Sequence, residues 1–241
     1  GARTAARGSF RPLVAPAVIG PTSRTVLKRD LLGSVCRLDL PAQGSHAGSA
    51  CIERDTRDAR WWLRLAARRL AAREAHALAA LQQVPGLPRL LQWDGHRLRR
   101  SWLDGQPMQR IQPRDPGYYR EALRLVRRLH AAGVVHNDLA KEPNWLVAPD
   151  GSPAVVDFQL AMRPRYRGWR FRVLAYDDLR HLLKHKRTYC PERLTARQRA
   201  ILARRSWPAA IWMRTGKPAY RWVTRGLLGW SDREGAGDRG H

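Results

Sequence analysis

The strongest constraint on the fold is a polar loop between a helix and a short hairpin in the second half of the chain. The helix is expected from about Tyr118 to Ala132, where a glycine ends it. The loop, residues 134–144, reads VVHNDLAKEPN. Two predicted strands follow, at 145–147 and 154–158, joined by a Pro-Asp-Gly turn signal. A hairpin placed directly after the loop brings the polar residues of both segments close together at one site.

The polar residues at that site are typical of phosphoryl transfer. His136 and Asp138 lie in the loop, Asn144 ends it, and Asp157 is at the end of the second strand. Phosphoryl transfer uses one carboxylate to orient the attacking hydroxyl, and an amide oxygen with a second carboxylate to hold magnesium against the nucleotide phosphates. Asp and Asn are also common in ordinary turns. Their joint occurrence with His136 and Phe158 nevertheless favours a catalytic set.

The first half of the chain predicts a small antiparallel sheet and one long helix. Extended patterns at 25–40, 49–54, 90–93 and 97–103 are separated by turns and by a helix from about Thr56 to Leu81. Asp55 or Thr56 is expected to cap this helix. Glu74 lies in the middle of its apolar stripe. An unpaired buried charge costs on the order of several kcal/mol, so we expect a specific basic partner, Arg54 in preference to Arg69 or Arg73.

These motifs resemble the catalytic core of the protein-kinase-like superfamily. The closer resemblance is to its small atypical members, the RIO-like kinases and the bacterial lipopolysaccharide-core (heptose and Kdo) kinases, and it covers roughly residues 25–186. It implies an α+β, two-lobed protein-kinase-like fold: a small antiparallel β lobe with one long helix, then a mainly helical C-terminal lobe. We expect a loosely ordered basic N-terminus at 1–24, a nucleotide lobe at 25–103, and a C-terminal lobe with the catalytic loop and a basic, Trp-rich tail at 104–241.

The resemblance implies a role for each residue of the loop and hairpin. Asp138 matches the catalytic base, and His136 matches the residue that braces the catalytic loop. Asn144 and Asp157 match the magnesium ligands. The implied cofactors are therefore ATP and Mg²⁺.

The resemblance also implies a phosphate-binding set in the first half. Glu74 matches the helix carboxylate that, in the superfamily, pairs with a phosphate-binding lysine of the third strand. Arg54 stands near the position of that lysine, and Lys28 is the alternative for its role. Gly33 matches the end of the glycine-rich loop.

Several positions depart from the superfamily pattern. Gly33 is the only glycine left of the glycine-rich loop, and Asn137 stands where an arginine is usual. The step from Asp138 to Asn144 is one residue longer than usual, Gln159 replaces the glycine of Asp-Phe-Gly, and no Ala-Pro-Glu follows. These departures argue against a long regulated activation segment. They also keep open a non-catalytic pseudokinase scaffold that binds an anionic partner.

Charge narrows the class of partner. The 45 Lys and Arg residues against 20 Asp and Glu give a net charge of +25, which attracts polyanions. Fourteen of the basic residues lie at 163–205, directly after Asp157, where they are expected to rim the acceptor side of the cleft. With the resemblance, this favours a sugar hydroxyl of the lipopolysaccharide core as acceptor. A RIO-like Ser/Thr protein kinase is the alternative enzyme, and nucleic acid is not expected as a partner.

Two further patterns concern the surface of the protein and its place in the cell. The arginines at 57, 60, 64 and 68 have helical spacing and are interpreted as a solvated face, with Trp61 and Trp62 as packing residues. The Trp-rich tail suits either a membrane interface or packing on the larger lobe. The sequence shows three scattered cysteines and no signal peptide, so we expect a cytoplasmic protein that can contact the inner membrane peripherally.

Overall fold

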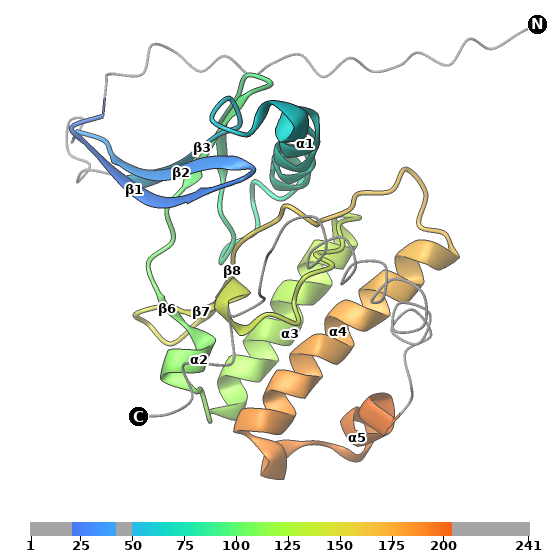
Figure 1. The fold of residues 1–241 in the computed structure, drawn as a ribbon. Helices are drawn as coiled ribbons and strands as arrows, with labels where there is room; N and C mark the ends of the chain where they lie inside the picture. The colour runs from blue at the N-terminus through green and yellow to red at the C-terminus, as the bar shows by residue number, and fades with distance from the viewer. Residues whose placement is uncertain (1–20, 42–49, 204–241) are drawn as a thin grey trace, which may run out of the picture. The chain divides into compact units, whose positions relative to one another are not determined.

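The structure, a computed structural model, describes residues 21–41 and 50–203 (Figure 1). The elements of the first half are β1 (Ser23–Asp30), β2 (Gly33–Asp39), β3 (Ala50–Asp55), α1 (Arg64–Ala80), β4 (Leu90–Trp93) and β5 (Arg97–Ser101). Those of the second half are β6 (Gln106–Pro107), α2 (Met108–Ile111), α3 (Pro116–Ala131), β7 (Trp145–Val147), β8 (Pro153–Val155), α4 (Trp169–Tyr189) and α5 (Ala196–Ala203). The chain divides into two compact units after Leu194, and α5 belongs to the second.

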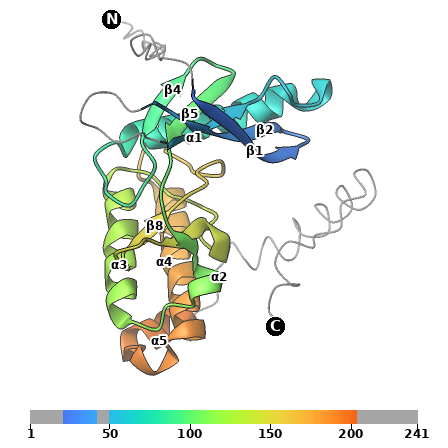
Figure 2. The same ribbon diagram turned by 90° about the vertical axis from the view of Figure 1, so that its left-hand side faces the viewer.

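The first half forms an antiparallel sheet with one helix beside it. The strand order is β1-β2-β3-β5-β4, and α1 packs against β4 and β5 (Figures 1 and 2). The second half holds a three-stranded antiparallel sheet, β6-β7-β8, and the long helices α3 and α4, which pack against each other. This mixture of antiparallel sheet and helix confirms the predicted α+β class.

One hydrophobic core joins α1, β4 and β5 of the first half to α3, α4, β7 and β8 of the second. Its fully buried side chains come from α1 (Leu78), β5 (Leu98), α3 (Leu129), β7 (Trp145) and the segment after β8 (Phe158). Since this core is shared, the helix of the first half and the hairpin of the second are held against a common set of apolar side chains.

A backbone bond ties the loop after α1 to the hairpin. The Val155 amide donates to the Gly86 carbonyl at 2.9 Å. Gly86 has a φ of +82°, and a Cβ there would lie 2.9 Å from the Pro153 carbonyl oxygen, so only glycine allows this close approach. This bond fixes the loop after α1 beside β8, the strand that leads to Asp157.

The prediction for the start of the long helix was wrong. The helix α1 begins at Arg64, after a 3₁₀ turn at 61–63, and no side chain caps it. The expected caps have other partners: the Thr56 hydroxyl donates to the His96 carbonyl at 2.9 Å, and Asp55 accepts from the Arg57 amide at 2.9 Å. The Thr56 bond joins the end of β3 to the β4–β5 turn, whereas the Asp55 bond closes a local turn, and the helix begins only after both.

Three other segments differ from expectation. Residues 104–107, expected as a linker, contain β6, which pairs with β7. The helix expected at about 177–186 is the longer α4. Trp61 and Trp62 are not packing residues, because 81% and 45% of their surfaces are exposed. The Trp-rich tail lies outside the described residues.

Candidate active site

The loop at residues 134–144, the candidate catalytic loop, holds Asp138 in a fixed position. The Asn144 side-chain amide donates to the Asp138 carboxylate at 3.1 Å and to the Asp138 carbonyl at 2.9 Å. The Lys141 ammonium lies 3.0 Å from the same carboxylate oxygen, Oδ2. Both contacts restrict the rotation of this carboxylate. Lys141 is a residue of this site that sequence reasoning missed.

The hairpin brings Asp157 next to this loop. The Val156 amide donates to the Asn144 carbonyl at 3.0 Å, which joins the strand end to the loop end. Asp157 has a φ of +64°, a left-handed conformation, and its carboxylate accepts from the Gln159 side chain at 2.9 Å. A non-glycine residue at positive φ is uncommon, although Asp adopts this conformation more readily than most, and such residues cluster at functional sites.

His136 braces the loop as a neutral side chain. It is fully buried, its Nε2 lies 3.1 Å from the Val156 carbonyl, and its ring packs edge-on against Phe158 at 4.6 Å. A carbonyl can only accept, so Nε2 carries the proton. Burial lowers the pKa of His136, although the Asp178 carboxylate opposes this shift. A neutral ring here can hold the backbone but is not placed to exchange protons with substrate.

The helix α4 holds the catalytic loop through three side chains. The Asp178 carboxylate accepts from the His136 and Asn137 backbone amides at 2.8 and 2.9 Å. Further along α4, His185 Nε2 lies 2.8 Å from the Leu139 carbonyl, and the Tyr189 hydroxyl donates to the Glu142 carboxylate at 2.9 Å. Asp178 could have been found from the sequence, because it is a carboxylate in an apolar helix face, as Glu74 is.

The expected pairing of Glu74 with Arg54 is present, and a second arginine shares it. The Glu74 carboxylate is completely buried. Arg54 Nε lies 3.6 Å from its Oε2, and Arg100 Nε lies 3.2 Å from its Oε1. Both arginine side chains are only 13% exposed. Two positive charges and one negative charge leave this cluster with a net charge of +1.

The pKa of Arg100 in this cluster also depends on Asp157. Burial lowers the pKa of the Arg100 guanidinium, Glu74 opposes this, Arg54 adds to it, and Asp157 opposes it. Arg100 follows another arginine on the strand RLRRS, and nothing in that pattern distinguishes it from its neighbour.

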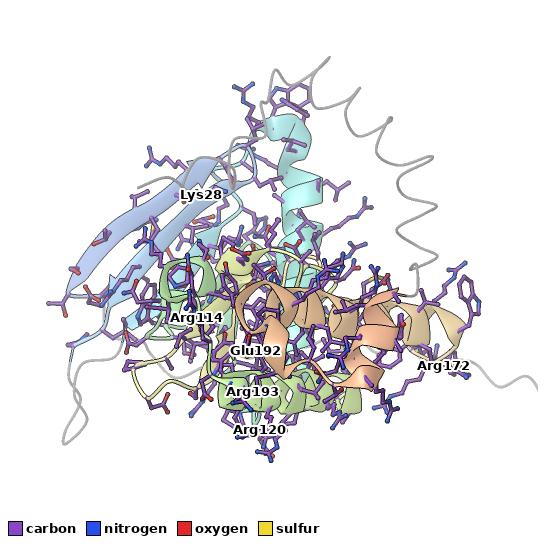
Figure 3. The ribbon with its side chains drawn as sticks, turned by 90° about the horizontal axis from the view of Figure 1, so that it is seen from below. Lys28, Arg114, Arg120, Arg172, Glu192 and Arg193 are labelled. Carbon is purple, nitrogen blue, oxygen red and sulfur yellow. The ribbon has the colours of Figure 1, made fainter. Side chains whose placement is uncertain are left out.

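Lys28 and Gly33 lie on the first two strands of the same sheet. Lys28 pairs with Val35 across β1–β2, and Val35 pairs with Arg54 across β2–β3, so the three share one cross-strand row. Lys28 is 51% exposed and lies 3.5 Å from Asp30, and Figure 3 shows it on the sheet. Gly33 closes the β1–β2 turn at a φ of +124°, and a Cβ there would overlap the Asp55 carbonyl oxygen.

The donor atoms of Asn144 and Asp157 suit magnesium. The Asn144 amide nitrogen is directed to Asp138, which leaves the amide oxygen for a metal. Magnesium is usually bound through one or two carboxylates together with substrate phosphates. Among the described residues, no group of three or more His, Cys, Asp or Glu side chains forms a self-contained metal site. The residues present therefore fit an ion held jointly with nucleotide phosphates.

Comparison with known families matches this geometry. The profile of the RIO domain family matches residues 49–199, which is more than half of the chain. The chain therefore belongs to the RIO domain family, within the atypical protein-kinase-like superfamily. A search of curated proteins finds no relative.

Among solved structures, the chain is similar to the crystal structure of the Rio2 kinase from Chaetomium thermophilum. The TM-score is 0.53 at 14% sequence identity, and the match covers 77% of this chain and 62% of that chain. At this identity the similarity shows the fold, which is the expected two-lobed kinase-like fold. The chain spans about three fifths of the length of that structure.

Proposed function

We propose that the protein is an ATP-dependent phosphotransferase that transfers the γ-phosphoryl group to a hydroxyl. The observation that carries this proposal is the junction of catalytic loop and hairpin. There the Asn144 side chain bonds the Asp138 carboxylate, and its carbonyl accepts from the residue before Asp157. Membership of the RIO domain family supports the same class of reaction.

Asp138 orients the acceptor hydroxyl and takes its proton. Lys141 and the Asn144 amide hold this carboxylate in one orientation. Asn144 Oδ1 and Asp157 hold Mg²⁺ together with the nucleotide, and the ion supplies charge neutralisation when bound. Once the phosphoryl group has moved, the proton stays on Asp138 until solvent removes it.

Arg54 and Arg100 bind the nucleotide phosphates. Glu74 neutralises one of the two guanidinium groups, and the remaining positive charge, in a poorly exposed site, favours an anionic ligand. Two arginines present planar, multiple donors, which suit phosphate oxygens better than a single point charge does. Lys28 is too exposed, and too closely paired with Asp30, to be the main phosphate contact.

The proposed acceptor is a sugar hydroxyl of the lipopolysaccharide core, at the cytoplasmic face of the inner membrane. Support comes from charge: Arg163, Arg165 and Arg167 follow Asp157 closely and are exposed. An exposed basic segment beside the site favours an anionic acceptor. Within residues 21–41 and 50–203, no helix combines the length and apolar character needed to cross a bilayer, and the membrane contact proposed here is a peripheral one.

A Ser/Thr side chain on a protein is the second candidate acceptor, favoured by the match to the RIO domain family. A pseudokinase scaffold is the third possibility, favoured by the single glycine of the β1–β2 turn and by arginine in place of lysine at position 54.

Transfer of labelled γ-phosphate separates the three candidates. Purified lipopolysaccharide core and a generic basic protein are offered separately with magnesium-ATP, using the wild type, Asp138→Ala and Asp157→Ala. Label on the glycan that both substitutions abolish supports the main proposal. Label on protein alone moves the assignment to the second candidate, and no transfer with no ATP binding leaves the scaffold.

A further inference from the structure

An apolar ridge stands exposed at the start of α1. Trp61, Trp62 and Leu65 are 81%, 45% and 58% exposed. Trp61 and Leu65 are four residues apart and share one face of the helix with Arg64 and Arg68. The buried residues of α1 are Ala67, Ala71, Glu74, Ala75, Ala77 and Leu78. Large apolar side chains are rarely left uncovered together, and such a group marks an interaction site.

A basic pocket lies directly beside this ridge. Its volume is about 240 Å³, and it is lined by Thr56, Arg57, Arg64, Arg68 and His96. It therefore sits between the exposed side of α1 and the β4–β5 turn. Three of its five lining residues are arginines, so the pocket attracts negative charge.

Two of these arginines have no carboxylate partner among residues 21–41 and 50–203. Arg57 lies 3.7 Å from Asp55 and 3.8 Å from Asp94. By contrast, the Nε atoms of Arg64 and Arg68 donate to the backbone carbonyls of Ala59 and Gly95, at 3.3 and 3.2 Å. Within the described part of the chain, neither has an acidic partner. These backbone bonds hold both guanidinium groups at the pocket with their charges unbalanced.

We propose that this surface docks the protein on a membrane that contains anionic phospholipid. Trp61, Trp62 and Leu65 enter the interfacial region, and Arg64 and Arg68 hold the phosphate of a headgroup in the pocket. Tryptophan favours the membrane–water boundary because one part of its ring system is apolar and its N–H is polar. Arginine can keep its charged end at the phosphates while its methylene stem stays in apolar surroundings.

The same surface is less suited to a nucleic-acid strand. Strand binding needs a basic groove that follows the backbone over several nucleotides, with aromatic rings as stacking platforms. Here the pocket is compact, and the ridge includes Leu65, which has no face for a base. This docking surface is distinct from the catalytic loop, so the inference does not depend on phosphotransfer.

Vesicle co-sedimentation tests the proposal. The full chain is mixed with phosphatidylcholine vesicles, with and without phosphatidylglycerol. We expect binding only to the anionic vesicles, and at least about tenfold weaker binding for the double variants Trp61→Ser/Trp62→Ser and Arg64→Gln/Arg68→Gln. The matched control is Arg120→Gln/Arg127→Gln, which removes the same charge from exposed positions of α3, where Figure 3 shows Arg120. It should bind nearly as the wild type does, and so should Asp138→Asn.

Three results would overturn the proposal. Binding that survives both surface variants places the membrane contact elsewhere in the chain. An equal loss in the α3 control means that total charge alone is responsible. Tighter binding to a single-stranded oligonucleotide than to anionic vesicles, lost in Trp61→Ser/Trp62→Ser, would assign the surface to nucleic acid instead.

Discussion

Arg100 shows how a single residue can change the charge of a buried site. With Arg54 alone, Glu74 would form a neutral pair, whereas Arg100 leaves the cluster at +1. Sequence spacing could place Glu74 and Arg54 together, because a carboxylate in an apolar stripe demands a partner. It could not select Arg100 from its neighbours, because alternate β5 side chains face opposite sides of the sheet and only the strand register decides which face each takes.

Removing that charge is expected to weaken nucleotide binding. Arg100→Met should raise the dissociation constant for magnesium-ATP about 10–100-fold, the loss of roughly 1.5–3 kcal/mol that a charge-assisted hydrogen bond contributes. Isothermal titration calorimetry measures this dissociation constant. Arg99→Met is the control, since Arg99 lies on the other face of the strand and pairs with Glu53 at 2.8 Å. Equal affinities in Arg100→Met and the wild type would remove Arg100 from the phosphate site.

Gly33 is expected to matter for stability first. Its φ of +124° disfavours any side chain, and an added Cβ would overlap the Asp55 carbonyl oxygen. Gly33→Ala should lower the free energy of unfolding by at least about 2 kcal/mol in urea titrations. Gly95→Ala, at a positive φ but in open space, should cost less. A stable Gly33→Ala that loses only ATP affinity would instead support a direct contact with phosphate.

Among the elements, α4 decides the shape of the catalytic loop. It supplies an acceptor to two loop amides and contacts two further loop residues through His185 and Tyr189. The sequence pattern located a helix here but made it too short and found no role for it. Asp178 stands out as a carboxylate on an apolar helix face, but its partners lie more than 40 positions away, so local periodicity does not identify them.

Asp178→Asn tests this bracing. An amide side chain has one acceptor oxygen, so either the His136 or the Asn137 backbone amide is left without its partner, at a cost of about 1–3 kcal/mol. We expect a lower kcat with little change in the affinity for ATP. The substitution moves Asp138 but leaves the cluster of Arg54, Arg100 and Glu74 in place. Urea unfolding and steady-state kinetics measure both effects. A fall in ATP affinity with kcat unchanged would contradict the bracing role.

The helix α4 should also make stability depend on pH. Burial lowers the pKa of His181 to about 4, with Lys184, His185 and Arg180 adding to the shift and Asp178 opposing it. A depressed histidine pKa means that the unfolded chain binds the proton more readily. Stability is therefore full above the unfolded pKa of about 6.5 and falls as the pH drops toward 4.

The size of this effect is measurable by difference. Between pH 7.5 and pH 5, the free energy of unfolding of the wild type should fall by about 2 kcal/mol more than that of His181→Gln, which does not titrate. Urea titrations at the two pH values give the comparison. If both proteins lose the same stability, His181 is not the group responsible.

For the molecule as a whole, the sequence could predict the fold class because its strongest signals are local and ordered. The helix, polar loop and hairpin of the second half follow one another along the chain, and the structure keeps that order. The α1 start was misplaced because the Thr56 hydroxyl donates to the His96 carbonyl and the Asp55 carboxylate accepts from Arg97, and these distant partners override the local helical pattern. Trp61 and Trp62 were misjudged because a tryptophan pair next to a helix is usually buried, and only the tertiary structure shows that nothing described covers them.

Net charge also acts across the whole chain. A charge of +25 is spread over the phosphate cluster, the exposed segment after Asp157 and the start of α1, among other positions. Each of these three positions faces a different proposed anion: nucleotide phosphates, the acceptor and the lipid headgroup. Sequence composition indicates that anions are bound, whereas the structure separates the positions at which each is expected.

Thermal stabilisation by nucleotide, measured with and without magnesium, is the sharpest test of the proposed phosphotransfer site. We predict that ATP with Mg²⁺ raises the Tm of the wild type more than ATP with EDTA does, since a ligand bound only by the folded state stabilises it. Asp157→Asn should lose the magnesium-dependent part of the rise, and Asp138→Asn should keep it while losing phosphoryl transfer. No rise with magnesium-ATP, or an equal magnesium-dependent rise in Asp157→Asn, would contradict the assignment of this site.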